Sequence, residues 1–318
     1  MSPEGRDTQF TGVAASIEYY LGTCEMTMSK LTALAPAKIN LILEVVGKRA
    51  DGFHEIRSLM QAIGLYDVLV FEASDRFAFS CSEDSLQSED NIVVRAVRLF
   101  EEKTNCTVNI GVHLTKRIPW AAGLGGGSSD AAVTLLALNE MLNWKCSAVD
   151  LFSMAAELGS DVPFFLSGGL ALIKGRGDQV TRLADLTQYW VVLVVPHLAV
   201  GENKTGNLYA RLTSSNYSNT NLSAEIMNVI ISTKSLDSRL LFNTFDAVAF
   251  EAFPSIEKYW KLFEQSASKT VHMAGSGPAL FSIYADKGEA EKLGAVLSGL
   301  GLNVYVVPTL LSGGLIKA

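Results

Sequence analysis

PWAAGLGGGSSD, at residues 119–130, carries four glycines within five positions. Glycines let the backbone approach a ligand closely and turn several N–H groups toward it. Apolar residues alternate before the stretch, at 108–114, and a helical apolar stripe follows it at 131–142, so it joins an expected strand to an expected helix. Ser128 and Ser129 are the expected N-caps of that helix, whose N-terminus adds a positive dipole end. These features together predict a phosphate-binding loop.

Two common phosphate-binding motifs do not match this loop. A P-loop requires Lys and then Ser or Thr after its glycines, whereas this loop continues as Gly127-Ser128-Ser129. A dinucleotide-binding fold requires GxGxxG and an acidic residue about 20 residues further on. Glu140 lies too early for that role, and Asp150 lies beyond a full helix and a turn. A strand–helix connection without a ligand is the alternative, which the glycine density disfavours.

A second group of polar residues lies on an expected strand at 37–45. Its apolar residues occupy alternate positions: Ile39, Leu41, Leu43 and Val45. This period of two predicts that Lys38 and Asn40 project from one face, opposite the apolar set. Taken alone, Lys38 is more simply explained as an edge lysine that extends to solvent.

Two further segments are candidates for chemistry. In LGSDVP, at 158–163, Ser160 is an expected cap of a short helix over 162–167. Asp161 then lies in the first turn, where the helix dipole favours a carboxylate. An ordinary capping acid explains Asp161 equally well. The glycine cluster AGSGP, at 274–278, precedes a strand and by itself more often marks a turn than a site.

The composition indicates a globular protein. The chain has 318 residues, of which 48% are hydrophobic and 19% charged, which suits two domains or one large one. Strand and helix patterns are mixed throughout, which favours an α+β or α/β fold. The polar stretch 201–223 is the expected long loop or domain junction.

Charge and residue spacing exclude several classes of protein. The net charge of −7 argues against a general binder of nucleic acids or membrane surfaces. The densest apolar stretch, 190–200, is too short to span a bilayer. The four cysteines and four histidines are scattered, so neither a disulfide framework nor a zinc site is expected, and a cytoplasmic location is favoured. Residues 1–27 hold one basic and four acidic residues, unlike a targeting peptide, and we expect a poorly ordered N-terminal extension there.

In their order along the chain, PAKINL at 36–41, the glycine-rich loop and AGSGP resemble the motifs of the galactokinase/homoserine kinase/mevalonate kinase/phosphomevalonate kinase superfamily. RADGFH at 49–54, the triple glycine and GSDVP at 159–163 are most similar to one branch of it. That branch phosphorylates a cytidine-diphosphate-linked methylerythritol in the methylerythritol phosphate route to isoprenoids. The resemblance extends from about residue 34 to the C-terminus and is vague between 197 and 270.

The resemblance implies a two-domain α+β small-molecule kinase. Its N-terminal half would be like the second domain of ribosomal protein S5 and its C-terminal half ferredoxin-like, with the active site in the cleft between them. We place an N-terminal kinase domain with the ATP phosphate loop at 28–185 and a C-terminal kinase domain at 186–318. The implied reaction moves the γ-phosphoryl group of ATP, with Mg²⁺, onto the 2-hydroxyl group of the methylerythritol unit. We expect this small-molecule substrate as partner, and a monomer or homodimer.

The resemblance also carries catalytic and nucleotide-binding roles onto matching positions. Asp161 matches the catalytic aspartate and Lys38 the catalytic lysine. Asn91, which opens a helix, falls where the family packs adenine. The expected phosphate-loop residues are Pro119, Trp120, Ala121, Ala122, Gly123, Leu124, Gly125, Gly126, Gly127, Ser128 and Ser129. A serine hydroxyl of this loop is a candidate Mg²⁺ ligand, although the sequence assigns none.

Substrate-binding roles follow in the same way. Asn40 and His54 match substrate contacts. Phe53 stands where the family often has a tyrosine that stacks on cytosine, and a phenylalanine ring keeps the stacking face. Tyr209 is the candidate for the second aromatic residue of the cytosine site.

Other functions stay open from the sequence alone. Asp161 is either a general base or only orients the acceptor hydroxyl. A sister kinase for homoserine, mevalonate or a sugar is one alternative, which the neighbouring Phe53 and His54 disfavour. A nucleotide-binding regulator without catalysis is another, which the presence of both Lys38 and Asp161 disfavours.

Overall fold

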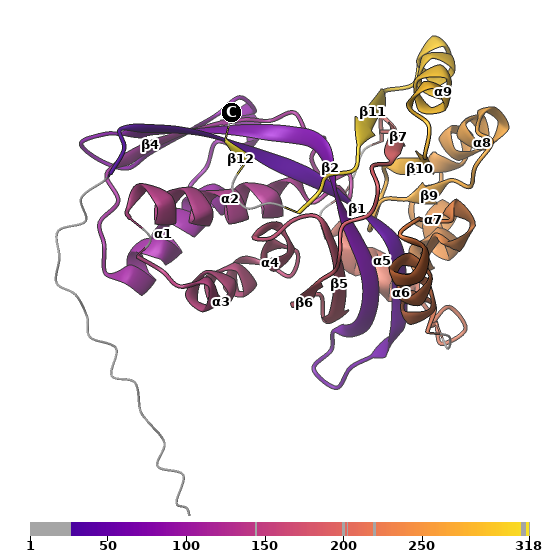
Figure 1. The fold of residues 1–318 in the computed structure, drawn as a ribbon, viewed down its shortest axis with the longest axis horizontal. Coiled ribbons are helices and arrows are strands. Elements are labelled where there is room, and N and C mark those ends of the chain that lie inside the picture. The colour runs from indigo at the N-terminus through magenta and orange to yellow at the C-terminus, as the bar shows by residue number, and fades with distance from the viewer. Residues whose placement is uncertain are drawn as a thin grey trace, which may run out of the picture.

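The computed structural model describes residues 27–317 except 144, 199–200, 202, 219–220 and 313–315. The expected extension therefore lies outside the described residues apart from Thr27, whose N–H donates to Met141 O at 2.8 Å. Two sheets organise the chain, each covered by helices (Figure 1). Because the strands pair mainly in antiparallel fashion, the fold is α+β, as expected.

The larger sheet contains eight strands among the described residues. They are β1 (Lys30–Lys48), β2 (His54–Ala73), β3 (Ala78–Cys81), β4 (Ile110–Thr115), β5 (Leu170–Gly175), β6 (Gln179–Arg182), β8 (Phe242–Asn243) and β12 (Ile316–Lys317). The main order is β12-β1-β2-β4-β3, with β5 and β6 joined through β2, and β8 through β1. The long β1 thus also pairs with two short strands from the C-terminal half of the chain. The expected domain boundary near 185 stays a prediction.

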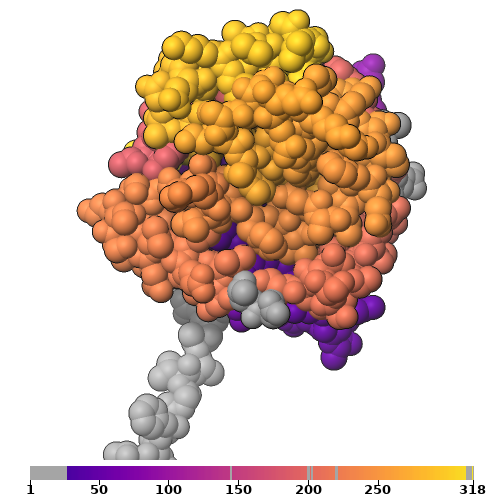
Figure 2. All heavy atoms as spheres, turned by 90° about the vertical axis from the view of Figure 1, so that its right-hand side faces the viewer, coloured from indigo at the N-terminus to yellow at the C-terminus, as the bar shows by residue number. Residues whose placement is uncertain are grey.

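The smaller sheet has the order β11-β7-β10-β9. Its strands are β7 (Trp190–Val194), β9 (His272–Met273), β10 (Leu280–Tyr284) and β11 (Val304–Pro308). The helices are α1 (Ile92–Thr104), α2 (Gly126–Met141), α3 (Ala148–Leu158), α4 (Val162–Phe165), α5 (Lys204–Arg211), α6 (Leu222–Thr233), α7 (Ala249–Ala252), α8 (Ile256–Ser266) and α9 (Lys287–Gly299). Helices α1 to α4 cover one face of the larger sheet (Figure 1). Figure 2 views the molecule from the right-hand side of Figure 1, where the C-terminal half, in orange to yellow, forms a broad surface with small indigo areas of the N-terminal part between its atoms.

A β-bulge corrects the expected faces of β1. The register between β1 and β2 shifts between Asn40 and Ile42, so Leu41 is the extra residue. An extra residue inverts which face the following side chains occupy. Ile39 and Leu41 accordingly pack in one hydrophobic cluster, whereas Leu43 and Val45 pack in another. The expectation that all four apolar residues share a face is therefore wrong.

The polar stretch 201–223 is not one long loop. Helix α5 occupies 204–211, and α6 begins at Leu222. Leu208 is the fully buried residue of α5 and Lys204 and Tyr209 are partly buried, whereas Thr205, Asn207 and Arg211 are exposed. One fully buried leucine in eight residues gives a weak apolar pattern, so the sequence does not indicate this helix.

Two features of the described residues concern membrane insertion and the state of the cysteines. No helix in it is long and apolar enough to cross a bilayer. Cys81 and Cys146 are free, whereas Cys106 is disulfide-bonded, which the scattered cysteine spacing did not predict.

Glu44 on β1 holds the start of α6. This fully buried carboxylate accepts hydrogen bonds from Leu222 N at 2.9 Å, from Ser223 Oγ at 2.9 Å and from Ser218 Oγ at 2.9 Å. A buried carboxylate is tolerated only when its oxygens are bonded, and here the donors come from the C-terminal half. Glu44 therefore ties the two halves of the chain together.

Replacing Glu44 tests this tie. We expect Glu44→Ala to lower the free energy of unfolding by about 3 kcal/mol, because several buried donors lose their acceptor. The control is Glu225→Ala, since Glu225 is an exposed residue in the first turn of the same helix and its loss is expected to cost less than about 0.5 kcal/mol. Equal effects of the two replacements in urea unfolding would contradict this role.

Candidate active site

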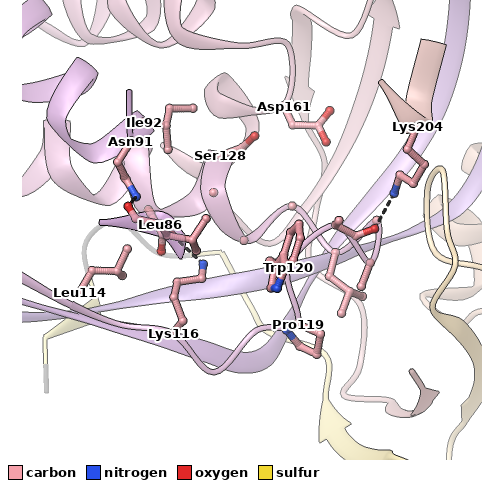
Figure 3. A pocket seen from close by; sticks show the side chains of 18 of the residues that line it. Leu86, Asn91, Ile92, Leu114, Lys116, Pro119, Trp120, Ser128, Asp161 and Lys204 are labelled. Atoms are coloured by element: carbon pink, nitrogen blue, oxygen red, sulfur yellow. Dashed lines mark hydrogen bonds and ion pairs between the residues drawn. The ribbon is translucent and has the colours of Figure 1, made fainter. Parts of the chain in front are cut away.

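A cavity of about 550 Å³ opens along the glycine-rich loop. Its volume is in the range of small-molecule sites. The lining includes 119–128 together with Lys38, Asn91 and Asp161, so the structure brings these segments into one place. Asn91 lies on one side of the cavity, and Asp161 and Lys204 lie toward the other (Figure 3).

The glycine-rich loop has left-handed backbone at the positions that shape it. Gly123 has φ 86° and Gly125 has φ 73°, conformations that glycine adopts without strain. Gly125 is the N-cap of α2, and Lys38 N donates to Leu124 O at 2.9 Å. The loop is therefore fixed on β1, and the N–H groups of the first turn of α2 begin at its end.

The expected serine caps are wrong. Because the helix begins at Gly126, Ser128 and Ser129 lie inside its first turn. Ser128 lines the cavity, whereas Ser129 is fully buried and its Oγ has no hydrogen-bond partner.

The AGSGP turn, a weak signal by itself, packs against the loop. A Cβ on Gly123 would lie 2.0 Å from Ala274 O, so only glycine permits this approach. Ala279 N donates to Ala122 O at 3.1 Å, and Ser276 lines the cavity. The turn therefore supports the glycine-rich loop from the C-terminal half.

Lys38 and Asn40 share a face, as expected from the alternation. Lys38 Nζ donates to Asn40 Oδ1 at 2.8 Å, and Asn40 Nδ2 donates to Ser58 Oγ at 2.7 Å. Lys38 Nζ also lies 3.6 Å from Asp161 Oδ2. The ammonium group is buried, with 5% of the side chain exposed, and Asp161 retains 36%, so the carboxylate stays accessible from the cavity.

Asp161 is not the ordinary capping acid that the sequence left open. It occupies the N-cap position of α4, but its side chain makes no capping hydrogen bond. Ser160 is therefore not the cap, and α4 ends at Phe165 instead of residue 167. The carboxylate faces Lys38 instead of the backbone of its own helix.

Asn91 and Trp120 lie along the same cavity. Asn91 caps α1, because its Oδ1 accepts from Val93 N at 2.9 Å and its Nδ2 donates to Leu86 O at 2.8 Å. Both the oxygen and the nitrogen of the Asn91 side-chain amide are thus hydrogen-bonded to the backbone. Trp120 is 63% exposed and offers a wide aromatic face.

Two of the expected substrate residues, His54 and Tyr209, form an aromatic cluster with Tyr217 outside this lining, whereas Asn40 contacts Lys38. His54 stacks on Tyr209 with ring centroids 4.6 Å apart, and its Nε2 lies 3.4 Å from Tyr217 Oη. Burial and the nearby Lys48 lower the pKa of His54. Phe53 is exposed at the tip of the β1–β2 hairpin and lies under the Arg176 guanidinium at 5.6 Å, so the structure does not place it against Tyr209.

Two cavity lysines were missed from the sequence. Lys116 lies between two buried carboxylates, Asp67 and Asp130, with Nζ 2.8 Å from Asp130 Oδ2. Burial raises the pKa of Asp130 to about 7, against the opposing charge of Lys116. Lys204 on α5 donates to Ala121 O at 2.8 Å and to Gly277 O. The partners of both lysines are distant in sequence, so no local sequence motif indicates that Lys116 or Lys204 lines the cavity.

Comparison with protein families matches both halves of the chain. Residues 91–169 match the GHMP kinases N terminal domain, and residues 231–301 match the GHMP kinases C terminal domain. The first match contains the glycine-rich loop and Asp161, and the second contains the AGSGP turn.

Individual relatives cover most of the chain. It is 42% identical over 282 residues to a 4-diphosphocytidyl-2-C-methyl-D-erythritol kinase of Dehalococcoides mccartyi, which covers 88% of this chain and 98% of that protein. A protein of the same name from Protochlamydia amoebophila is 38% identical over 81% of this chain and 85% of its own length.

Solved structures show the same fold. A crystal structure of 4-(cytidine 5'-diphospho)-2C-methyl-D-erythritol kinase has a TM-score of 0.75 at 30% identity and covers 89% of this chain and all of its own. A homoserine kinase from Cytophaga hutchinsonii has a TM-score of 0.70 at 18% identity, over 92% of this chain and 99% of its own, and shares the fold alone.

Two glycines of the loop provide a matched test of its geometry. At Gly125, with φ 73°, a Cβ would lie 2.9 Å from Lys38 Cγ and 2.9 Å from Phe165 Cζ. We expect Gly125→Ala to lower the free energy of unfolding by about 2–4 kcal/mol through backbone strain and overpacking. The free energy of unfolding of Gly127→Ala should differ from that of the unmodified protein by less than about 1 kcal/mol. A Cβ there meets only Ile92 Cγ2 at 3.7 Å in a helical backbone. Similar urea midpoints for both variants would contradict the described loop.

Proposed function

The chain belongs to the 4-diphosphocytidyl-2-C-methyl-D-erythritol kinases among the GHMP kinases, and we propose that it transfers the γ-phosphoryl group of ATP to the 2-hydroxyl group of 4-diphosphocytidyl-2-C-methyl-D-erythritol. This is a step of isoprenoid precursor biosynthesis by the methylerythritol phosphate pathway. One observation carries the proposal: Lys38 Nζ and Asp161 Oδ2 lie 3.6 Å apart in a cavity lined by a glycine-rich helix start.

The loop and the start of α2 bind the phosphates of ATP. Backbone N–H groups and the positive end of the helix dipole favour anions there. No side chain beyond glycine stands in the way at 125–127, and Ser128 adds a hydroxyl group. The adenine then lies toward Asn91 and Ile92, on the side of the cavity away from Asp161 and Lys204 (Figure 3).

Lys38 and Asp161 carry out the chemistry. Phosphoryl transfer depends mainly on positioning and on neutralising charge. Asp161 holds the acceptor hydroxyl group and accepts its proton at a carboxylate oxygen. Lys38, held by Asn40 at 2.8 Å, offsets the negative charge that develops on the migrating group.

Mg²⁺ accompanies the nucleotide in this proposal. Among the residues that the structure describes, there is no group of three or more His, Cys, Asp or Glu that would hold a metal ion alone. Ser128 lines the cavity, and the buried Ser129 Oγ lacks a partner, so hydroxyl ligands lie at the start of α2. These residues fit Mg²⁺, which keeps several waters and shares phosphate oxygens. When bound, the ion neutralises phosphate charge.

The cytidyl end of the substrate lies toward the aromatic cluster. His54 supplies a directional hydrogen bond, Tyr209 an aromatic face already stacked on it, and Phe53 a second, exposed face. Binding energy from a base remote from the reacting hydroxyl group positions that group. A monomeric or homodimeric state, a cytoplasmic location and the lack of nucleic-acid binding stay predictions.

Substrate choice tests the proposed function. In a coupled assay of ADP release, we expect turnover of the cytidyl substrate and none of mevalonate, homoserine or free methylerythritol, because only the first offers a base to the aromatic cluster. The assay contains ATP and Mg²⁺ throughout. Equal turnover of mevalonate or homoserine would overturn the assignment.

Replacing Asp161 tests the mechanism. We expect Asp161→Asn to lower kcat by about 10²–10⁴-fold with ATP binding retained, since the general base is lost. Asp90→Asn is the control of equal charge, because Asp90 lines the same cavity beside Asn91. Near-normal kcat in the Asp161 variant would show that the carboxylate is not the base.

A further inference from the structure

Three lysines line the cavity within the described part of the chain, and they differ in their partners. Lys38 has Asp161 and Asn40, and Lys116 lies between Asp67 and Asp130. The partners of Lys204 are two backbone carbonyl groups, those of Ala121 and Gly277. Carbonyl groups carry no net charge, so no carboxylate among the described residues compensates the ammonium charge of Lys204.

The position of Lys204 places this charge at the phosphate loop. Ala121 belongs to the loop and has φ 55°, a left-handed conformation that is unusual for a residue with a side chain. Gly277 belongs to the AGSGP turn, which packs on the loop. The neighbouring Thr205 also reaches that turn, with Oγ1 3.0 Å from Ser276 Oγ. Lys204 thus joins both glycine segments from the side of α5.

The proposed function brings a polyphosphate into this cavity, and the inference rests on it. An ammonium group has three donors, and the two carbonyl groups use two of them. Charged hydrogen bonds from lysine to phosphate are among the strong ones in proteins. We propose that Lys204 is a further phosphate-binding residue, which contacts the polyphosphate of ATP and gains there an anionic partner that the described residues do not supply.

The surroundings of Lys204 provide a signature for this contact. Burial, with a smaller effect of Lys38, lowers the pKa of Lys204 to about 7. The other titratable groups that line the cavity among the described residues are Lys38, Asp161, Lys116, Asp130 and Asp90, and the AGSGP turn contributes none. Because a phosphate beside the amine favours its charged form, the pKa rises on binding. Between the two pKa values, nucleotide binding therefore takes up a proton.

Calorimetry at pH 8 in buffers of different ionisation enthalpy measures this uptake directly. The probe is the non-hydrolysable analogue β,γ-imido-ATP with Mg²⁺. We expect the full chain to take up more than about half a proton per nucleotide, since an amine of pKa about 7 is mostly neutral at pH 8. Lys204→Met abolishes this uptake. Lys204→Arg also abolishes it, but retains more affinity because the guanidinium group is always charged.

Affinity separates a phosphate contact from a structural one. We expect Lys204→Met to weaken binding of the analogue by about 10- to 100-fold, as for the loss of a charged hydrogen bond. Binding of adenosine should stay unchanged. The control is Lys292→Met, because Lys292 is exposed on α9 far along the chain from the loop. Cytidine diphosphate, titrated in parallel, represents the other source of phosphate.

Several results overturn the inference. They are unchanged affinity for the analogue in Lys204→Met, equal weakening of adenosine and analogue, a loss confined to cytidine diphosphate, and no proton uptake by the unmodified protein. If the unmodified protein does not bind the analogue at all, the proposed function itself fails, and the two failures are therefore distinguishable.

Discussion

The site is organised by one buried ammonium group, that of Lys38. A charge removed from water requires close polar partners, and Asn40 and Asp161 provide them. The same group also requires space. A Cβ on Gly125 would lie 2.9 Å from Lys38 Cγ, and a Cβ on Gly275 would lie 2.8 Å from Lys38 Nζ. The glycines of two distant motifs thus leave room for one side chain, while the partners of that side chain hold the proposed catalytic carboxylate in place.

An acidic chain can hold an anionic substrate here because positive charge is concentrated in the cavity. The net charge is −7, yet the cavity collects Lys38, Lys116 and Lys204 around a helix N-terminus. The three amines are held differently, by one carboxylate, by two carboxylates and by carbonyl groups. The electrostatic field in the cavity therefore depends on which partners each amine has, and the net charge of the chain does not reveal those partners.

The parts of the site that rest on local pattern were predictable from the sequence. Glycine density indicated the loop, and alternation placed Lys38 beside Asn40. The parts set by long-range pairing were not. The bulge at Leu41 depends on the partner strand, and α5 is stabilised by tertiary packing more than by its own pattern. The cap of α2 is Gly125 instead of a serine because contacts with Lys38 and Phe165 favour a left-handed glycine there.

A double-mutant cycle on Lys38 and Asp161 tests the central claim most directly. The single variants Lys38→Met and Asp161→Asn and the double variant are compared by kcat with the cytidyl substrate. Because the two groups act on one transferred phosphoryl group, the account predicts that the double variant loses little more than the worse single variant. Losses that multiply fully, as for independent groups, would contradict it.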